Sequence, residues 1–130
     1  MLEALYREQI IDRYKHPRFK GALEDPEAVY ELDNPLCGDR VKVMLKRDAQ
    51  GRVQARFEGQ GCAIAMASAD LLMESIQGRS LDEVRKLTKE HVFRLLGLPL
   101  RPARAKCALL PFKALKIAAY GLPEQPLGHV

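Results

Sequence analysis

Residues 53–77 constrain the fold most strongly, because a strand pattern meets a helix pattern there across two glycines. In residues 53–58 apolar and polar side chains alternate, which is the period of a strand with one buried face. Gly59 and Gly61 follow, and glycine permits backbone angles that allow a sharp turn and the close approach of another segment. From residue 62 the side chains are small and helix-forming, so we expect a helix over residues 62–77.

Cys62 falls at the start of this expected helix. The unpaired N–H groups and the positive end of the helix dipole at such a position favour a thiolate. A thiolate is the form of cysteine that binds a metal or attacks sulfur. A free cysteine is also often a small buried hydrophobic residue. The local sequence leaves both interpretations open.

The other patterns predict an α+β fold, in which helices cover one face of a three-stranded antiparallel sheet. One face of the expected sheet is apolar, as it should be where helices pack on one side only. Strands are expected over residues 28–34, 41–46 and 53–58, and further helices over residues 2–15, from Ser80 to about Lys86, from Thr88 to Leu96 and from Ala108 to Tyr120. Pro111 is expected in the first turn of the last helix, where proline is tolerated. At this length, residues 1–130 are expected to form one domain.

The charge pattern and the apolar runs argue against several classes of function. The formal net charge of +4 is modest, and aromatic residues are not interleaved with basic ones, so nucleic acid is not an expected partner. No apolar run is long enough to cross a membrane, and the N-terminus does not resemble a secretion signal, so we expect a cytoplasmic protein. In a reducing compartment the three cysteines are expected to be free thiols, metal ligands or sulfur carriers.

Cys37 and Asp39 flank a glycine in the loop expected between the first two strands. A thiolate and a carboxylate so placed can converge on a metal ion. The alternative is a turn in which Asp39 only accepts hydrogen bonds from nearby N–H groups. Cys107 is expected at the N-terminus of the last helix, but no pair of cysteines has the Cys-x-x-Cys spacing of common zinc modules. The residue patterns therefore lead to a candidate metal site of three cysteines and Asp39.

Two histidines, His16 and His91, are further candidate ligands. His16 ends the first expected helix, where interaction with the negative end of the helix dipole is the commoner role. His91 is expected to be exposed on its helix. Neither residue is expected to bind a metal.

Four motifs along the chain resemble those of the iron–sulfur cluster scaffold proteins called IscU, SufU or NifU N-terminal domain. The motifs are Leu5-Tyr6 with Ile11 and Tyr14-Lys15-x-Pro17, Asn34-Pro35-x-Cys37-Gly38-Asp39, Gly59-x-Gly61-Cys62-Ala63-Ile64 with Ser68-Ala69, and Lys106-Cys107-Ala108-x-Leu110. The resemblance covers nearly the whole chain in the right order. It implies a compact α+β fold with a three-stranded antiparallel sheet and helices packed on it.

The resemblance also implies that Cys37, Asp39, Cys62 and Cys107 converge at one exposed end of the molecule. There they would hold a transient [2Fe–2S] cluster, or Zn²⁺ in the cluster-free form. Sulfur would come as a persulfide from a cysteine desulfurase, and the cluster would pass to apo iron–sulfur proteins or carrier proteins. The cysteine that accepts sulfur matches Cys107 in scaffold-type members and Cys37 in SufU-type members, so both are candidates. Asp39 is expected to keep the cluster labile, because a carboxylate is a poorer cluster ligand than a thiolate.

Because of two departures from the family pattern, the chain combines features of IscU members with features of SufU members. Lys106 stands where IscU members usually carry a histidine, which resembles SufU members, yet the extra segment that SufU members usually have between the second and third cysteines is missing. Protonated lysine cannot bind a metal, and we expect Lys106 to favour the thiolate form of nearby cysteines. Residues 100–104 match the chaperone-binding motif of IscU only loosely, which makes an Hsp70-type chaperone a doubtful partner.

Three hypotheses of function follow from the sequence. The leading one is a scaffold or carrier protein on which a cluster is built and then passed on, which is not an enzyme in the usual sense. The alternative is a zinc-dependent sulfurtransferase that accepts persulfide from a cysteine desulfurase and activates it. The third is a structural zinc domain with no redox role.

Overall fold

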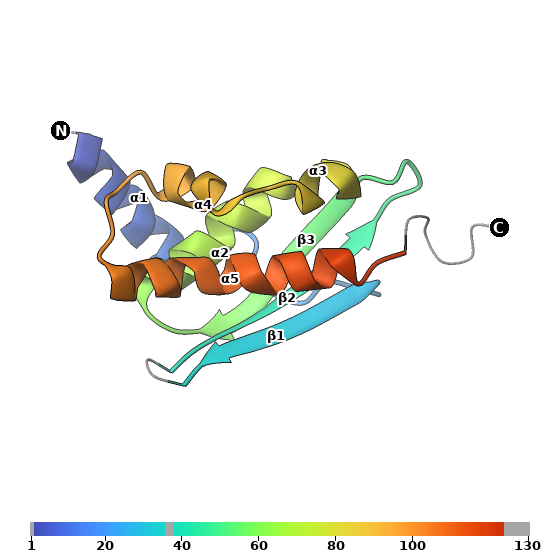
Figure 1. The fold of residues 1–130 in the computed structure, drawn as a ribbon, viewed down its shortest axis with the longest axis horizontal. Coiled ribbons are helices and arrows are strands. Elements are labelled where there is room, and N and C mark those ends of the chain that lie inside the picture. Colours follow the sequence, from blue (N-terminus) through green and yellow to red (C-terminus); the bar gives the residue numbers. More distant parts are fainter. Residues whose placement is uncertain (1, 36–37, 124–130) are drawn as a thin grey trace.

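The computed structural model describes residues 2–35 and 38–123, and in these ranges it contains three strands and five helices (Figure 1). The strands form one antiparallel sheet in the order β1-β2-β3. The elements are α1 Leu2–Lys15, β1 Ala28–Asn34, β2 Asp39–Arg47, β3 Val53–Gln60, α2 Ala63–Ile76, α3 Leu81–Arg85, α4 Lys89–Leu96 and α5 Pro102–Tyr120. The α+β architecture expected from the sequence is therefore confirmed.

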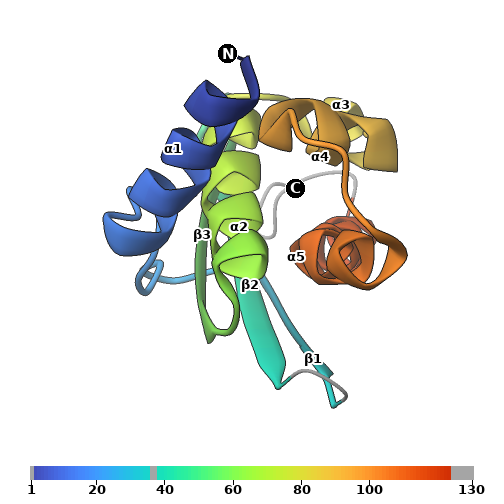
Figure 2. The ribbon, with the colours of Figure 1, turned by 90° about the vertical axis from the view of Figure 1, so that its left-hand side faces the viewer.

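The core lies between the sheet and the helices on one of its faces. The alternating apolar residues of β2 and β3 are buried, and Val43 pairs with Phe57 at the centre of the sheet with neither side chain exposed. Helix α2 packs on β3, while α5 packs on β1 and β2 (Figure 2). Helix α1 packs on α2. The strand period of two thus supplies one apolar face, and the helices remove that face from water.

The turn residues around the short helices behave largely as expected. Ser80 and Glu83 form a complete capping box at the start of α3. Thr88 is the N-cap residue of α4, but its side chain makes no capping hydrogen bond. Gly97 ends α4 in the left-handed conformation, with φ of +71°.

Helix α5 begins earlier than the sequence predicted, and this places Cys107 differently. The helix starts at Pro102, because a proline at the first helical position has no N–H that needs a partner and has a suitable φ. Cys107 is therefore inside the helix and not at its N-terminus, so that expectation was wrong. Pro111 is likewise an interior residue and not one of the first turn. It has no N–H to donate to the carbonyl four residues earlier, and its side chain is buried.

The strands β2 and β3 extend further than expected toward the candidate site. Asp39 is the first residue of β2 and not part of a loop, and β3 continues through Gly59 to Gln60. Gly59 pairs with Val41 at a φ of +155°, so it continues the strand and does not turn it. A Cβ at this position would lie 2.1 Å from the carbonyl oxygen of Arg40. The expected close approach of another segment is thus confirmed, but the sharp turn at Gly59 is not.

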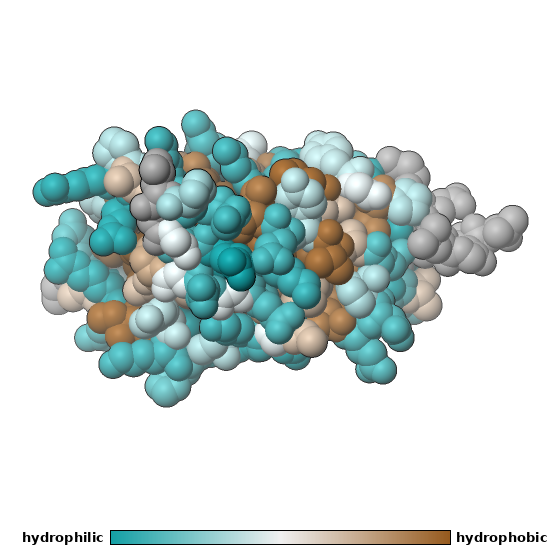
Figure 3. Space-filling model, turned by 90° about the horizontal axis from the view of Figure 1, so that it is seen from below, coloured by the Kyte–Doolittle hydropathy of each residue, from teal (hydrophilic) through white to brown (hydrophobic). Residues whose placement is uncertain are grey.

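The face drawn in Figure 3 is hydrophilic over wide areas. On the face drawn in Figure 3, hydrophobic patches are broken up by hydrophilic side chains. No helix among the described residues combines the length and the apolar character that crossing a bilayer requires.

Candidate metal centre

Three of the four predicted ligands lie together at one end of the sheet. Asp39 comes from the first position of β2, Cys62 from the residue before α2, and Cys107 from α5. One potential ligand atom from each residue lies within 4.8 Å of the other two. The fourth predicted ligand, Cys37, lies outside the described residues.

The pairing of β2 with β3 brings Asp39 to Cys62. Arg40 pairs with Gln60, so the chain leaves β3 beside Asp39 and reaches Cys62 two residues later. The backbone N–H of Cys62 donates to Asp39 Oδ1 at 2.9 Å. The Cys62 Sγ lies 3.7 Å from Asp39 Oδ2. The carboxylate of Asp39 is therefore held by the backbone of the segment that carries the cysteine.

Cys62 is the N-cap residue of α2, as the sequence predicted. Its backbone is extended, and its sulfur accepts a hydrogen bond from the N–H of Ala65 at 3.4 Å. This is the interaction that a serine or aspartate makes at an N-cap. It satisfies one of the free N–H groups at the helix start and fixes the direction of the sulfur.

Gly61 leaves room for the Asp39 carboxylate. A Cβ on Gly61 would lie 2.5 Å from Asp39 Oδ1 and 2.9 Å from its Cγ. Contacts this short do not occur, so any side chain at position 61 requires the carboxylate to move. The glycine between the strand and the N-cap cysteine is thus part of the candidate centre.

The described donors are less exposed than the family resemblance implied. Asp39 is 1% exposed and Cys107 is 5% exposed, whereas Cys62 is half-buried. The expectation of an exposed end therefore needs correction for Asp39 and Cys107, which are buried, whereas Cys62 is partly exposed. The burial follows from the position of Asp39 under the Gly61 backbone and from the position of Cys107 within α5.

Lys106 is exposed on α5 and lines a groove beside the centre. The groove has a volume of about 370 Å³ and is lined by Asp33, Asn34, Pro35, Lys106, Leu109, Leu110 and Lys113. It lies between the end of β1 and the segment of α5 that carries Cys107. The proposed influence of Lys106 on the cysteine thiols stays a prediction.

The donor set fits a tetrahedral ion. For Zn²⁺, ligand distances of about 2.3 Å to sulfur and 2.0 Å to oxygen place a sulfur and an oxygen about 3.5 Å apart. The Cys62 Sγ and Asp39 Oδ2 are 3.7 Å apart, close to this separation. Two sulfurs on such an ion are about 3.8 Å apart, so atoms within 4.8 Å of one another need to shift by about 1 Å or less. Three donors leave one position of the tetrahedron for a further ligand.

Neither histidine belongs to this group of donors. His16 is exposed at the end of α1, and its backbone N–H donates to the Asp12 carbonyl oxygen. His91 was expected to be exposed, but it is half-buried, and its Nε2 lies 2.9 Å from the Ser75 hydroxyl on α2. The packing of α4 against α2 accounts for this difference.

Comparison with known proteins gives consistent matches over most of the chain. Residues 5–127 match the family of NifU-like N-terminal domains. A zinc-dependent sulfurtransferase SufU from Bacillus subtilis is 37% identical, over 88% of this chain and 89% of the relative. An iron–sulfur cluster assembly enzyme IscU from Drosophila melanogaster is 35% identical, over 94% of this chain and 82% of the relative.

Solved structures agree with these matches. A candidate iron–sulfur cluster assembly scaffold protein for the SUF system from Fervidobacterium islandicum has a TM-score of 0.75 and 30% identity, and the match covers 90% of this chain and 98% of the other. The N-terminal part of a NifU-like protein from Brucella abortus has a TM-score of 0.70 and 25% identity, over 91% and 94% of the two chains.

Proposed function

Because the chain belongs to the family of NifU-like N-terminal domains, we propose that it is a scaffold for iron–sulfur cluster assembly. The observation that carries this proposal is the gathering of Asp39, Cys62 and Cys107 from three separate elements. Two thiols and a carboxylate form a donor set suited to iron or zinc. We propose Cys37 as the fourth ligand. The cargo is a labile [2Fe–2S] cluster, and Zn²⁺ binds in its absence.

Sulfur reaches the scaffold by thiol–persulfide exchange with a cysteine desulfurase. The acceptor thiolate attacks the outer sulfur of the desulfurase persulfide, a new S–S bond forms, and the desulfurase cysteine leaves as a thiolate. The proton lost by the acceptor thiol balances the one that the leaving thiolate takes up. Cys107 and Cys37 are the candidate acceptors. Iron arrives separately, and an external reductant of the thiol class supplies the two electrons that convert each persulfide sulfur to the sulfide of the cluster. The finished cluster then passes to apo iron–sulfur proteins or carriers.

The second candidate function is a zinc-dependent sulfurtransferase. The match to a relative of that name at 37% identity favours it, as does Lys106 before the third cysteine. In this case the same four residues hold Zn²⁺, which keeps its cysteine ligands deprotonated. The chain would accept sulfur from the desulfurase and hand it on without building a cluster.

Anaerobic reconstitution distinguishes the two functions. The protein is incubated with Fe²⁺, cysteine, dithiothreitol as reductant and a catalytic amount of desulfurase. A scaffold develops visible charge-transfer absorption and then activates an apo-ferredoxin. A sulfurtransferase speeds the desulfurase with zinc bound and remains colourless, whereas a structural zinc domain does neither and unfolds when chelated. Cys62→Ser is the control for colloidal iron sulfide, because it should form no transferable cluster.

Asp39→Ala should slow cluster transfer to apo-ferredoxin by about tenfold. Asp39 is the poorest of the proposed cluster ligands, and it is the residue that we expect to keep the cluster labile. The measurement is the rate at which ferredoxin circular dichroism appears after reconstitution. Asp39→Asn is the matched control, since an amide oxygen still accepts the Cys62 N–H but carries no charge. A transfer rate equal to or faster than that of the wild type would count against the role assigned to Asp39.

A further inference from the structure

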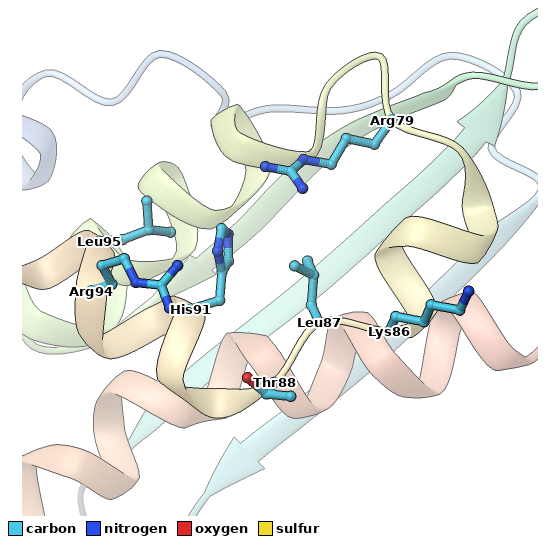
Figure 4. A pocket seen from close by; sticks show the side chains of 7 residues that line it. All are labelled: Arg79, Lys86, Leu87, Thr88, His91, Arg94 and Leu95. Atoms are coloured by element: carbon cyan, nitrogen blue, oxygen red, sulfur yellow. The ribbon is translucent and has the colours of Figure 1, made fainter.

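A second pocket lies between α3 and α4 and contains none of the residues of the candidate metal centre. Its volume is about 350 Å³. It is lined by Arg79, Lys86, Leu87, Thr88, His91, Arg94 and Leu95 (Figure 4). Three of these side chains are cationic and one is a histidine, and no carboxylate lines the pocket.

The two arginines converge on the histidine. Figure 4 shows the guanidinium groups of Arg79 and Arg94 directed toward the ring of His91 from different sides, while the ammonium of Lys86 points away. Arg79 is fixed by its Nε, which donates to the Ser75 carbonyl oxygen at 2.8 Å. The His91 ring is fixed by its contact with the Ser75 hydroxyl. Arg79 and His91 are therefore held in place by hydrogen bonds to the same residue of α2, and the exposed Arg94 side chain approaches them from α4.

One nearby carboxylate interacts with one of the arginines electrostatically: hydrogen bonds from Ser80 and, to a smaller extent, the charge of Arg79 lower the pKa of the exposed Glu83 carboxyl. Within residues 2–35 and 38–123, Arg79 and Arg94 form no ion pair. Of the acidic side chains on α3, Asp82 pairs with Lys86, and Glu83 accepts the Ser80 N–H in the capping box. Burial lowers the pKa of His91, and the charges of Arg79 and Arg94 lower it further. The ring thus lies in a positive field.

We propose that this pocket binds the phosphate group of a small organic phosphate of nucleotide size. Arginine presents a planar set of N–H donors that matches phosphate oxygens, and charge-assisted hydrogen bonds of this kind are strong. The Thr88 hydroxyl makes no capping bond and is a further donor at the start of α4. Leu87 and Leu95 form apolar walls for the organic part. The volume is at the lower end of the range for small-molecule sites. This inference does not rest on the proposed function.

Titration of the purified protein with four probes tests the proposal. The probes are ADP, AMP, inorganic phosphate and adenosine, and binding is followed at low ionic strength by calorimetry and by the ring resonances of His91. ADP should bind at least about tenfold more tightly than inorganic phosphate, and adenosine should not bind. A bound phosphate should raise the pKa of His91, because an adjacent anion favours the imidazolium.

Variants test whether ADP binding depends on the residues of this pocket or on the general positive charge of the surface. Arg94→Gln should weaken ADP binding about tenfold or more, and Arg94 is exposed, so its replacement should not disturb folding. Arg79→Gln should have a similar effect, and Arg79→Lys should restore part of the affinity. Lys89→Gln removes the same charge from α4 outside the pocket and should change affinity by less than about twofold.

Three outcomes would overturn the proposal. One is the absence of heat and of any His91 shift up to about 10 mM ADP. Another is an equal loss of affinity in Lys89→Gln and Arg94→Gln, which would mean unspecific attraction. The third is binding of inorganic phosphate as tight as that of ADP, which would exclude recognition of the organic part. Cluster reconstitution is measured separately, so none of these results bears on the scaffold function.

Discussion

Asp70→Asn should lower the free energy of unfolding by about 3–5 kcal/mol, the range expected when one partner of a buried ion pair is removed. Asp70 is fully buried on α2, and its Oδ2 accepts from Arg13 Nη1 at 2.9 Å. Its Oδ1 accepts the backbone N–H groups of Arg18 and Phe19 at 2.9 and 2.7 Å. Asparagine keeps an oxygen for those N–H groups but turns an NH₂ group toward the guanidinium of Arg13. The Asp70 carboxylate therefore links α2 to α1 and to the segment after α1 that contains Arg18 and Phe19.

Glu74→Gln is the matched control for Asp70→Asn. Glu74 binds the other end of the same guanidinium, with Oε1 at 2.7 Å from Arg13 Nη2, but its side chain is 47% exposed. Its loss should therefore lower stability by less than about 1 kcal/mol. Urea denaturation followed by circular dichroism gives both values, provided that metal content is equal, since bound metal adds stability. A difference between the variants of less than about 1 kcal/mol would contradict the role given to Asp70.

The sheet and most of the helices could be predicted because their signals are local. Alternation over residues 53–58 gives β3, and the capping box at Ser80 gives the start of α3. The start of α5 was missed because Pro99 and Pro102 resemble loop residues, while Pro102 is in fact the first residue of the helix. Proline is common both in loops and at that helical position, so composition does not separate the two.

The approach of two of the three described donors, Asp39 and Cys62, follows from the pairing of neighbouring strands. The register of β2 with β3 pairs Arg40 with Gln60, so Asp39 necessarily comes close to Gly61 and Cys62. Cys107 has no such link, because α5 reaches the site only through its packing on β1 and β2. The residue pattern offered Cys107 as a candidate ligand, and the motif resemblance implied that it converges with the others. Its burial inside a helix depends on tertiary contacts that the sequence does not reveal.

Sequence patterns could not predict polar contacts between residues that are far apart in the chain. The partners of Asp70 lie more than fifty positions earlier in the chain, and only the folded structure shows that they meet. The same holds for the basic pocket, where Arg79 and Arg94 come from different segments and His91 was expected to face solvent. A charged residue among the apolar residues of a helix, as at Asp70 between Ala69 and Leu71, is the signal in the sequence that a buried partner exists.

Gly61→Ala should weaken Zn²⁺ binding by about 10–100-fold, the loss typical when a supporting contact of a ligand is disturbed. The new methyl group would lie 2.5 Å from Asp39 Oδ1, so the carboxylate must move away from the Cys62 N–H and from the sulfur of Cys62. The affinity is measured by competition with a chromophoric chelator. Gly121→Ala is the control, because its φ of −78° suits any residue and its Cβ would lie 3.4 Å from the nearest atom, so its metal affinity should equal that of the wild type.

A double-mutant cycle tests whether Gly61 acts through the carboxylate. Asp39→Ala removes the oxygen and the Cγ that the methyl group would meet, so the second substitution should have little further effect on Zn²⁺ affinity. The double variant should therefore bind Zn²⁺ about as weakly as Asp39→Ala alone. If the two losses instead add up in full, the alanine disturbs the centre by another route, such as the backbone before α2. Non-additive losses would show that the alanine at position 61 acts by displacing the Asp39 carboxylate. They would also explain why a glycine is needed between β3 and Cys62.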